Sequence, residues 1–344
     1  TLEVPVAGLF GVPADAGAVS LNVTVVGPET PGHVTVFPCG VAEPNASTVN
    51  FAAGEVIANA ALAQPGTDGK VCVFTSSTTD LVVDLNGYLP TGAGFTSQDP
   101  VRVADTRPGQ PVAFPTPKAT VPSGGTLEVP VAGLFGVPAD AGAVSLNVTV
   151  VGPQTAGHVK VFPCGVVAPN ASTVNFAAGQ VIANMALAQP GTDGKVCVFS
   201  SSITDIVVDL NGWFTASPAF TSLAPVRVAD TRPGTPVAFP LPKAKVPSGG
   251  TLEVPVAGLF GVPADAGAAS LNVTVVRPET AGHVTVFPCG VAEPNASTVN
   301  FAAGEVIANA ALTKVGAGGK VCVTSSSITD IAVDLNGWFP PSPP

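Results

Sequence analysis

The sequence predicts an all-β protein of tandem antiparallel β-sandwich domains, Ig-like or jelly-roll-like, with one disulfide in each domain. Three observations predict this. The segment that begins at Thr1 returns at Thr126 and again at Thr251, and a period of this length is long enough for a whole domain. Each copy consists of short alternating runs between Gly- and Pro-rich turns. Two cysteines stand at equivalent places in every copy.

The first copy divides into short predicted strands along its length. In chain order they cover residues 2–6, 19–25, 34–36, 49–51, 56–62, 71–74 and 81–85. In the second of them Val, Leu and Val alternate with Ser20, Asn22 and Thr24, so one face is expected in the core and the other in water. Thr35 is replaced by Lys160 in the second copy, which also favours a solvent-facing position.

The cysteines are always 33 residues apart, and the chain has a single Met. Regular pairs in such a chain predict one disulfide per domain and an oxidising compartment. Closing a loop of this length contributes about 3–4 kcal/mol in the chain-entropy model. The predicted pairs are Cys39 with Cys72, Cys164 with Cys197, and Cys289 with Cys322.

A stretch ending in Asp-Thr-Arg complicates the domain boundaries, because it occurs twice rather than three times, as Pro100–Arg107 and Pro225–Arg232. It opens the domain that follows it or closes the one before. We favour the first choice, because the Asn-Gly-Tyr/Trp stretches are typical of domain ends. The predicted domains are then 1–90, which lacks its first strand, 91–215 and 216–344. An unpaired sheet edge invites pairing with another chain.

Composition narrows the function classes. The net charge of −10 disfavours nucleic acid and anionic membranes as partners, since both attract basic patches. Runs of about 20 apolar residues are all interrupted, so no membrane insertion is expected. Only 10% of the residues are charged, and the side chains are chemically quiet.

Catalytic and metal-binding readings are weak. The three histidines (His33, His158 and His283) each follow a turn, without a triad around them. We therefore predict no enzyme, no catalytic residues and no cofactor. Calcium stays possible through Asp68 and Asp193, but the third copy has no acid at this turn.

Two recurring groups remain. The buried-strand acids Asp84, Asp209 and Asp334 need a partner, and Arg107 or Arg232 is a plausible one for a structural ion pair. The aromatic residues Tyr88, Trp213 and Trp338 recur at one position per domain. They are candidates for stacking on a sugar, or else core or interdomain anchors.

The combined motifs resemble a known repeat. They are Phe-Pro-Cys-Gly at 37–40, Asn-Phe-Ala-Ala-Gly at 50–54, Val-Cys-Val at 71–73, Asp-Leu-Asn-Gly-Tyr at 84–88 and Asp-Thr-Arg at 105–107. The chain resembles a tandem β-rich repeat of secreted and surface proteins of high-GC Gram-positive bacteria. The resemblance implies secretion, a disulfide and an accessory role beside extracellular hydrolases, although no catalytic domain accompanies the repeats here.

We therefore predict a non-enzymatic structural protein that is extracellular or on the cell surface. It would form a rod, stalk or filament segment, with polymerisation by strand complementation as a further possibility. Its partners would be copies of itself or adjacent repeats of a longer chain. The alternative is a multivalent module that binds carbohydrate or cell-wall glycans through the three aromatic positions.

Overall fold

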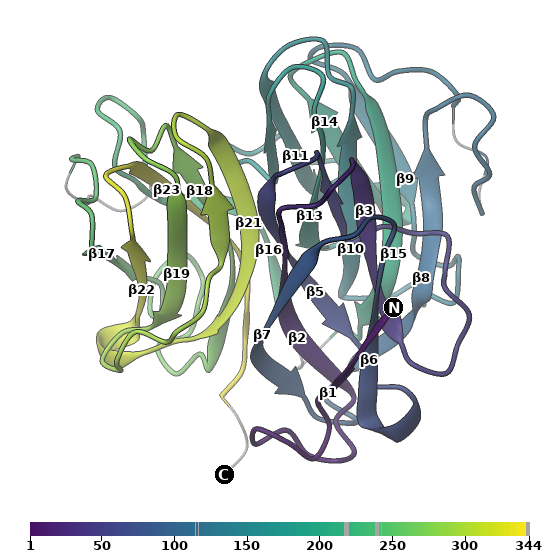
Figure 1. Cartoon of the computed structure of the whole chain (residues 1–344), viewed down its shortest axis with the longest axis horizontal. Coiled ribbons are helices and arrows are strands. Elements are labelled where there is room, and N and C mark those ends of the chain that lie inside the picture. Colours follow the sequence, from purple (N-terminus) through teal and green to yellow (C-terminus); the bar gives the residue numbers. More distant parts are fainter. Residues whose placement is uncertain (114, 116, 217–219, 238–240, 242, 342–344) are drawn as a thin grey trace.

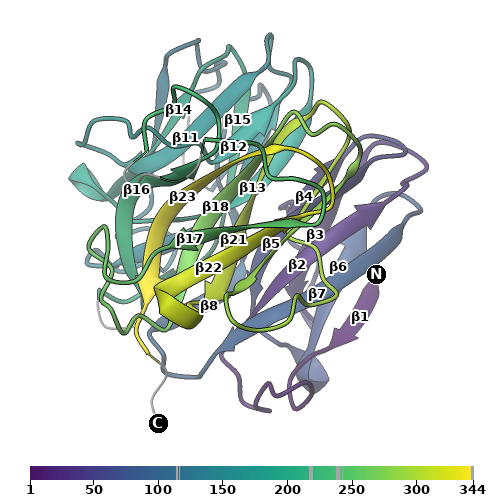
Figure 2. The ribbon, with the colours of Figure 1, turned by 90° about the vertical axis from the view of Figure 1, so that its left-hand side faces the viewer.

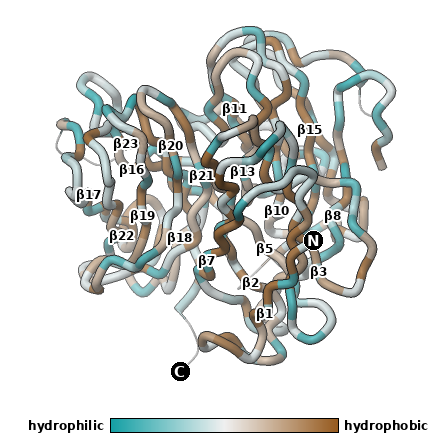
Figure 3. The backbone as a smooth tube through the Cα atoms, in the orientation of Figure 1, coloured by the Kyte–Doolittle hydropathy of each residue, from teal (hydrophilic) through white to brown (hydrophobic). Residues whose placement is uncertain are grey.

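The computed structural model describes residues 1–344 except 114, 116, 217–219, 238–240, 242 and 342–344. The described chain is built from β-strands, with three short 3₁₀ turns, and the expected all-β class is confirmed. Strands form where β-branched and apolar residues alternate with small polar ones, and they end at the Gly- and Pro-containing turns. In Figure 3 brown, hydrophobic stretches follow strands in the middle of the molecule, where β13 and β21 are labelled.

Each repeat supplies a common series of strands, and the second and third repeats add one strand at the start. The elements of residues 1–90 are β1 (Leu2–Pro5), β2 (Ala18–Val26), β3 (Gly32–Pro38), β4 (Val49–Phe51), β5 (Val56–Ala63), η1 (Thr67–Gly69), β6 (Lys70–Thr75) and β7 (Asp80–Leu89). We call this the first repeat.

The second repeat, 91–215, begins with an additional strand. Its elements are β8 (Phe95–Asp105), β9 (Thr126–Pro130), β10 (Ala143–Val151), β11 (Gly157–Pro163), β12 (Val174–Phe176), β13 (Val181–Ala188), η2 (Thr192–Gly194), β14 (Lys195–Ser200) and β15 (Asp205–Phe214). The third repeat, 216–344, has the same order. Its elements are β16 (Thr221–Asp230), β17 (Gly250–Pro255), β18 (Ala268–Val276), β19 (Gly282–Pro288), β20 (Val299–Phe301), β21 (Val306–Lys314), η3 (Ala317–Gly319), β22 (Lys320–Ser325) and β23 (Asp330–Phe339).

The strands form six small sheets, two from each repeat. One kind of sheet has the orders β1-β6-β3-β4, β9-β14-β11-β12 and β17-β22-β19-β20. The other kind has the orders β5-β2-β7, β13-β10-β15-β8 and β21-β18-β23-β16. Sheets of the second kind have four strands in the later repeats and three in the first. The strands that contain Asp-Thr-Arg, β8 and β16, pair antiparallel with β15 and β23.

The expectation of tandem β-sandwich domains was wrong. The six sheets are arranged about a common centre in the manner of a six-bladed propeller, although strands within a blade are not consecutive along the chain. Figures 1 and 2 show the third repeat, in green and yellow, packed beside the other two rather than following them in a line. Contacts between repeats are cyclic, because β4 lies against β13, β12 against β21, and β20 against β5.

The physical reason is that both faces of the central strands are buried. In β2 the polar residues Ser20, Asn22 and Thr24 are 6%, 1% and 2% exposed, although the alternation predicted that they face water. Thr35 is buried too, and its hydroxyl donates to the Ala46 carbonyl. Small uncharged polar side chains can be buried when they find hydrogen-bond partners. A neighbouring repeat supplies the partner of Asn22, whose amide donates to the Ser297 carbonyl. The hydroxyls of Ser20 and Thr24 have no hydrogen-bond partner among the described residues.

A closed set of asparagine hydrogen bonds joins the three repeats. The side-chain amide of Asn59 donates to Oδ1 of Asn147 at 2.8 Å. Equivalent bonds run from Asn184 to Asn272 and from Asn309 back to Asn22. The second of each pair in turn donates to a backbone carbonyl of a neighbouring repeat, as Asn147 does to Ser47. Loss of one of these buried hydrogen bonds would leave polar atoms unpaired and would lower the free energy of unfolding by about 1–3 kcal/mol.

Apolar residues from all three repeats also meet at the centre. Phe214, Phe220 and Phe339 form a cluster with ring centroids 4.7–5.9 Å apart. Ala60, Leu62 and Met185 belong to the same buried group. A core shared in this way couples the stability of the repeats to one another.

All three predicted disulfides are formed, with Cα atoms 4.9–5.0 Å apart. Each joins the end of one strand to its neighbour in the same sheet, as Cys39 after β3 is joined to Cys72 in β6. The described chain has no free cysteine. The three bonds indicate an oxidising environment.

Candidate functional site

The free edge of β7 distinguishes the first repeat from the other two. β15 is covered along this edge by β8, and β23 by β16. Among the residues that the structure describes, β7 has β2 on one side and no strand on the other. We call this the β7 edge. The covered edges of β15 and β23 show what a strand does when it lies there.

The covering strand places an arginine on the buried acid. Arg102 of β8 donates from Nε and Nη2 to the two carboxylate oxygens of Asp209, at 2.9 and 3.1 Å. Arg227 of β16 makes the same bidentate contact with Asp334, at 2.7 and 2.9 Å. Burial raises the pKa of Asp209 and of Asp334, and the guanidinium opposes that rise.

The arginine predicted from the sequence was therefore the wrong one. Arg107 pairs with Asp105 two residues before it, at 2.6 Å, and Arg232 pairs with Asp230 at 2.5 Å. Burial alone would raise the pKa of Asp105, but the hydrogen bonds and charge of Arg107 outweigh it and lower that pKa. A sequence signal for Arg102 did exist. In Val101-Arg102-Val103 the arginine alternates with two apolar residues that pack toward the core, so its side chain lies on the other face of β8. This is the face of the sheet on which Asp209 of β15 lies opposite Arg102.

The threonine of the motif closes the end of the pairing. The Thr106 hydroxyl donates to Asp205 at 2.7 Å and accepts the Ile206 amide at 3.0 Å. Thr231 repeats both contacts with Asp330 and Ile331. The Asp-Thr-Arg stretch thus ends the covering strand. Its aspartate forms an ion pair with the arginine two residues later, and its threonine fixes the register against the neighbouring strand.

Asp84 occupies the equivalent position on β7 without this partner. Its carboxylate accepts the Ser297 amide at 3.2 Å, as Asp209 accepts the Ser47 amide. No ion pair to Asp84 occurs within the described part of the chain. Partial burial raises the pKa of Asp84, with only the Ser297 hydrogen bond opposing the rise. The first repeat therefore presents an acid without the cation that its counterparts have.

Apolar surface is also uncovered at the β7 edge. Val82 is 46% exposed, whereas its counterparts Val207 and Ala332 are 2% and 1% exposed. A Cβ atom at Gly87 would meet nothing within 4 Å, while one at Gly212 would lie 2.5 Å from the Thr96 carbonyl oxygen of β8. The space that β8 fills in the second repeat is open in the first.

The three recurring aromatic residues differ in exposure for the same reason. Tyr88 is 41% exposed. Trp213 and Trp338 are half-buried against the core, opposite Thr96 of β8 and Thr221 of β16. One of the three candidate stacking rings is therefore exposed.

The other candidates lie apart from the β7 edge. The ring of His33 lies 5.9 Å from that of Phe74, and burial lowers the pKa of His33. Asp68 and Asp193 have φ of 56° and 57°, and Gly318 has 68° at the equivalent turn, so this position requires the left-handed conformation. Within the described ranges no three His, Cys, Asp or Glu side chains gather in a metal-binding group.

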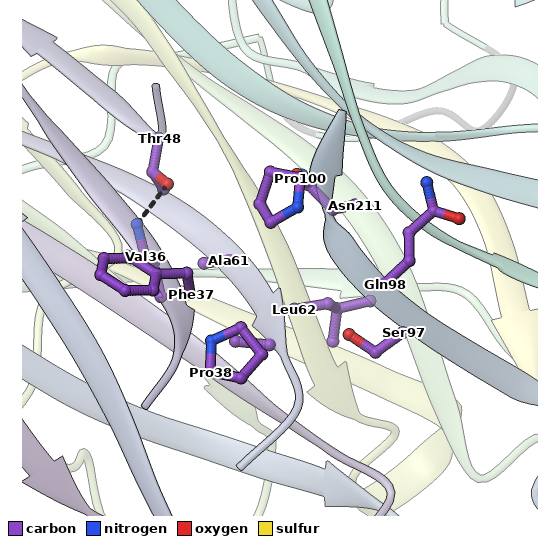
Figure 4. Close-up of a pocket in the computed structure, with 11 residues that line it drawn as sticks. Val36, Phe37, Pro38, Thr48, Ala61, Leu62, Ser97, Gln98, Pro100 and Asn211 are labelled. Carbon is purple, nitrogen blue, oxygen red and sulfur yellow. Dashed lines mark hydrogen bonds between the residues drawn. The ribbon is translucent and has the colours of Figure 1, made fainter. Parts of the chain in front are cut away.

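Two crevices lie between the first and second repeats. One, of about 10 Å³, is lined by Phe37 and Pro38 of β3 and by Gln98 and Pro100 of β8 (Figure 4). This is room for about one water molecule. A wider, open one of about 270 Å³ lies beside Arg102, between Pro100 and Pro111. Its polar lining does not assemble a nucleophile with a base.

No helix in the described residues has the length and apolar character needed to cross a bilayer.

Comparison with known proteins adds little to this picture. No protein-family model matches the chain, and no curated protein matches it. A solved structure titled "Life in the extremes: atomic structure of Sulfolobus Turreted Icosahedral Virus" aligns over 97% of this chain and 84% of that chain. The identity is 10% and the TM-score 0.20, values at which the likeness carries no argument about fold or function.

Proposed function

We propose that the chain is a non-enzymatic structural protein outside the cell. It is a rigid unit that is joined to a partner polypeptide by strand addition at the β7 edge. The rod expected from the sequence takes a different form in this proposal. The three repeats close around one centre. A long assembly would therefore form by joining whole chains to one another, and not by lining up the three repeats of one chain.

One observation carries the proposal. The edges of β15 and β23 are covered by strands, and the same edge of β7 is open with Val82 and Tyr88 exposed on it. An open edge presents unpaired backbone donors and acceptors, which another chain can pair with. Shared apolar clusters, disulfides and closed hydrogen bonds support a load-bearing role for the rest of the molecule.

Strand addition predicts that the secreted protein occurs in complexes larger than its single polypeptide chain. Mass photometry and electron microscopy of protein from the culture medium measure this directly. The blocking variant is Val82→Lys, because an edge lysine disfavours strand pairing. Val41→Lys, at a loop residue of similar exposure, is the matched control. The proposal requires loss of the complexes in Val82→Lys alone. Complexes that persist equally in both variants, or a wild-type chain that stays single, contradict it.

A further inference from the structure

We propose that the strand received at the β7 edge is of the Asp-Thr-Arg type, with the order apolar–Arg–apolar–Ala–Asp–Thr–Arg. This inference rests on the proposed function and adds the chemistry of the strand. Its basis is the comparison of one open edge with two covered ones in the same molecule.

Charge complementarity calls for the arginine. The carboxylates equivalent to Asp84 each receive two guanidinium bonds from the covering strand. Asp84 already has the same backbone contact with a neighbouring repeat, so its carboxylate is held in the matching place. Charge-assisted bidentate contacts are the strong and directional ones. A strand without an arginine at this register would cover Asp84 and leave it unpaired.

β7 also has an acceptor for the threonine of an Asp-Thr-Arg strand. Asp80 is exposed at the start of β7, and its counterparts Asp205 and Asp330 each accept a threonine hydroxyl of the covering strand. The amide of Ile206 donates to the Thr106 hydroxyl. The equivalent amide on β7 belongs to Leu81. An Asp-Thr-Arg terminus thus satisfies an acid and a backbone donor together.

Shape agrees with charge. Phe95 and Phe220 begin the covering segments, and a Cβ atom at Gly212 or Gly337 would lie within 2.8 Å of their rings. Glycine at these positions lets the covering strand approach closely. Gly87 retains this feature with open space beside it. The first repeat is therefore shaped for a strand that begins with an aromatic residue.

The covering strand is not one that the described residues of this chain have free. Both of its own Asp-Thr-Arg strands are already paired, β8 with β15 and β16 with β23. Pairing the β7 edges of two copies would bring Asp80 and Asp84 of both edges together, and like charges across a strand pair are unfavourable. A second copy in this state therefore has neither a free strand nor a complementary edge, which leaves an Asp-Thr-Arg strand that is not among those of residues 1–344.

The test uses the whole chain and a fluorescent peptide with the sequence of residues 95–107. Binding is measured by anisotropy and located by amide hydrogen exchange. We expect saturable binding with protection of β7. An Arg102→Gln peptide, and an Asp84→Asn chain, should each bind at least about tenfold more weakly. Glu55→Gln is the matched control chain, because it removes one carboxylate from the turn before β5, at the opposite edge of the sheet, and copies the natural Gln180.

A steric variant tests the register. Gly87→Ala should abolish binding of both peptides, because the equivalent Cβ on β15 would collide with β8. Binding that survives Gly87→Ala places the peptide elsewhere and overturns the inference. Equal binding of the native and Arg102→Gln peptides at β7 also overturns it but leaves strand addition standing. Absence of binding by either peptide removes both proposals. Self-association of the chain that protects β7 without peptide would make a second copy the occupant, against the inference.

Discussion

The ion pairs under the covering strands lead to a quantitative comparison within one molecule. Asp209→Asn removes the negative charge that faces Arg102, in a pair whose side chains are 1% and 12% exposed. Asp84→Asn removes the same charge at the equivalent place, where no described cation faces it. The asparagine oxygen can still accept the backbone amide of Ser47 or Ser297 in either variant, so the two changes differ in the arginine.

Breaking a buried pair from one side costs about 3–5 kcal/mol, and we take about 3 kcal/mol because Arg102 keeps some access to water. Unfolding entropy of about 2.1 cal/mol/K per residue over 344 residues converts this to a fall in Tm of roughly 4 °C. For Asp84→Asn the expected change is within about 0.5 kcal/mol, or less than about 1 °C. It should tend toward stabilisation, because partial burial disfavours the charged carboxylate.

Scanning calorimetry of the two variants measures the difference. Asp334→Asn is an internal replicate, because Arg227 faces it in the same geometry, and it should resemble Asp209→Asn. Equal losses for Asp84→Asn and Asp209→Asn would refute the reasoning, since the arginine would then contribute nothing.

Three further outcomes are expected. Gly212 and Gly87 have φ of 155° and 159°, but only at Gly212 would an added Cβ atom meet a covering strand. Gly212→Ala should therefore lower the free energy of unfolding in urea by about 1–3 kcal/mol more than Gly87→Ala does. Equal losses in the two variants would contradict this. Asp105 has a lowered pKa, so its stabilisation is present above the unfolded pKa of about 3.9 and is lost as pH falls through the folded value. Unfolding titrations of Asp105→Asn should therefore converge with wild type in acid, and a gap that does not depend on pH would count against it. Replacing Cys164 and Cys197 by alanine should cost about 3–4 kcal/mol in the same urea assay, and an unchanged midpoint would be incompatible with the disulfide's role.

Local features of this fold were accessible from the sequence. Alternation located the strands, and the fixed spacing of the cysteines identified the disulfides. The presence of two covering strands for three repeats within residues 1–344 followed from counting Asp-Thr-Arg stretches. These features depend on residues that are close in the chain or on a comparison between the three copies. A single sequence is therefore enough to predict them.

The arrangement of the repeats was not accessible in the same way. Asn22, Asn59 and Thr24 have the pattern of a solvent-facing row, yet other repeats bury them. A period-two pattern shows which residues share a face and does not show what covers that face. A weak signal existed, since the row is uncharged in a chain with only 10% charged residues. The partner of Asp209 was missed because the prediction considered the arginine that ends the Asp-Thr-Arg stretch and not Arg102, which the strand register places opposite the acid.

The most direct measurement is a crystal structure of the chain with the 95–107 peptide. The account predicts that the peptide lies antiparallel along β7, that its arginine forms a bidentate contact with Asp84 at about 3 Å, and that its threonine bonds to Asp80. A peptide seated away from β7, or one whose arginine points to solvent while Asp84 stays unpaired, would contradict it.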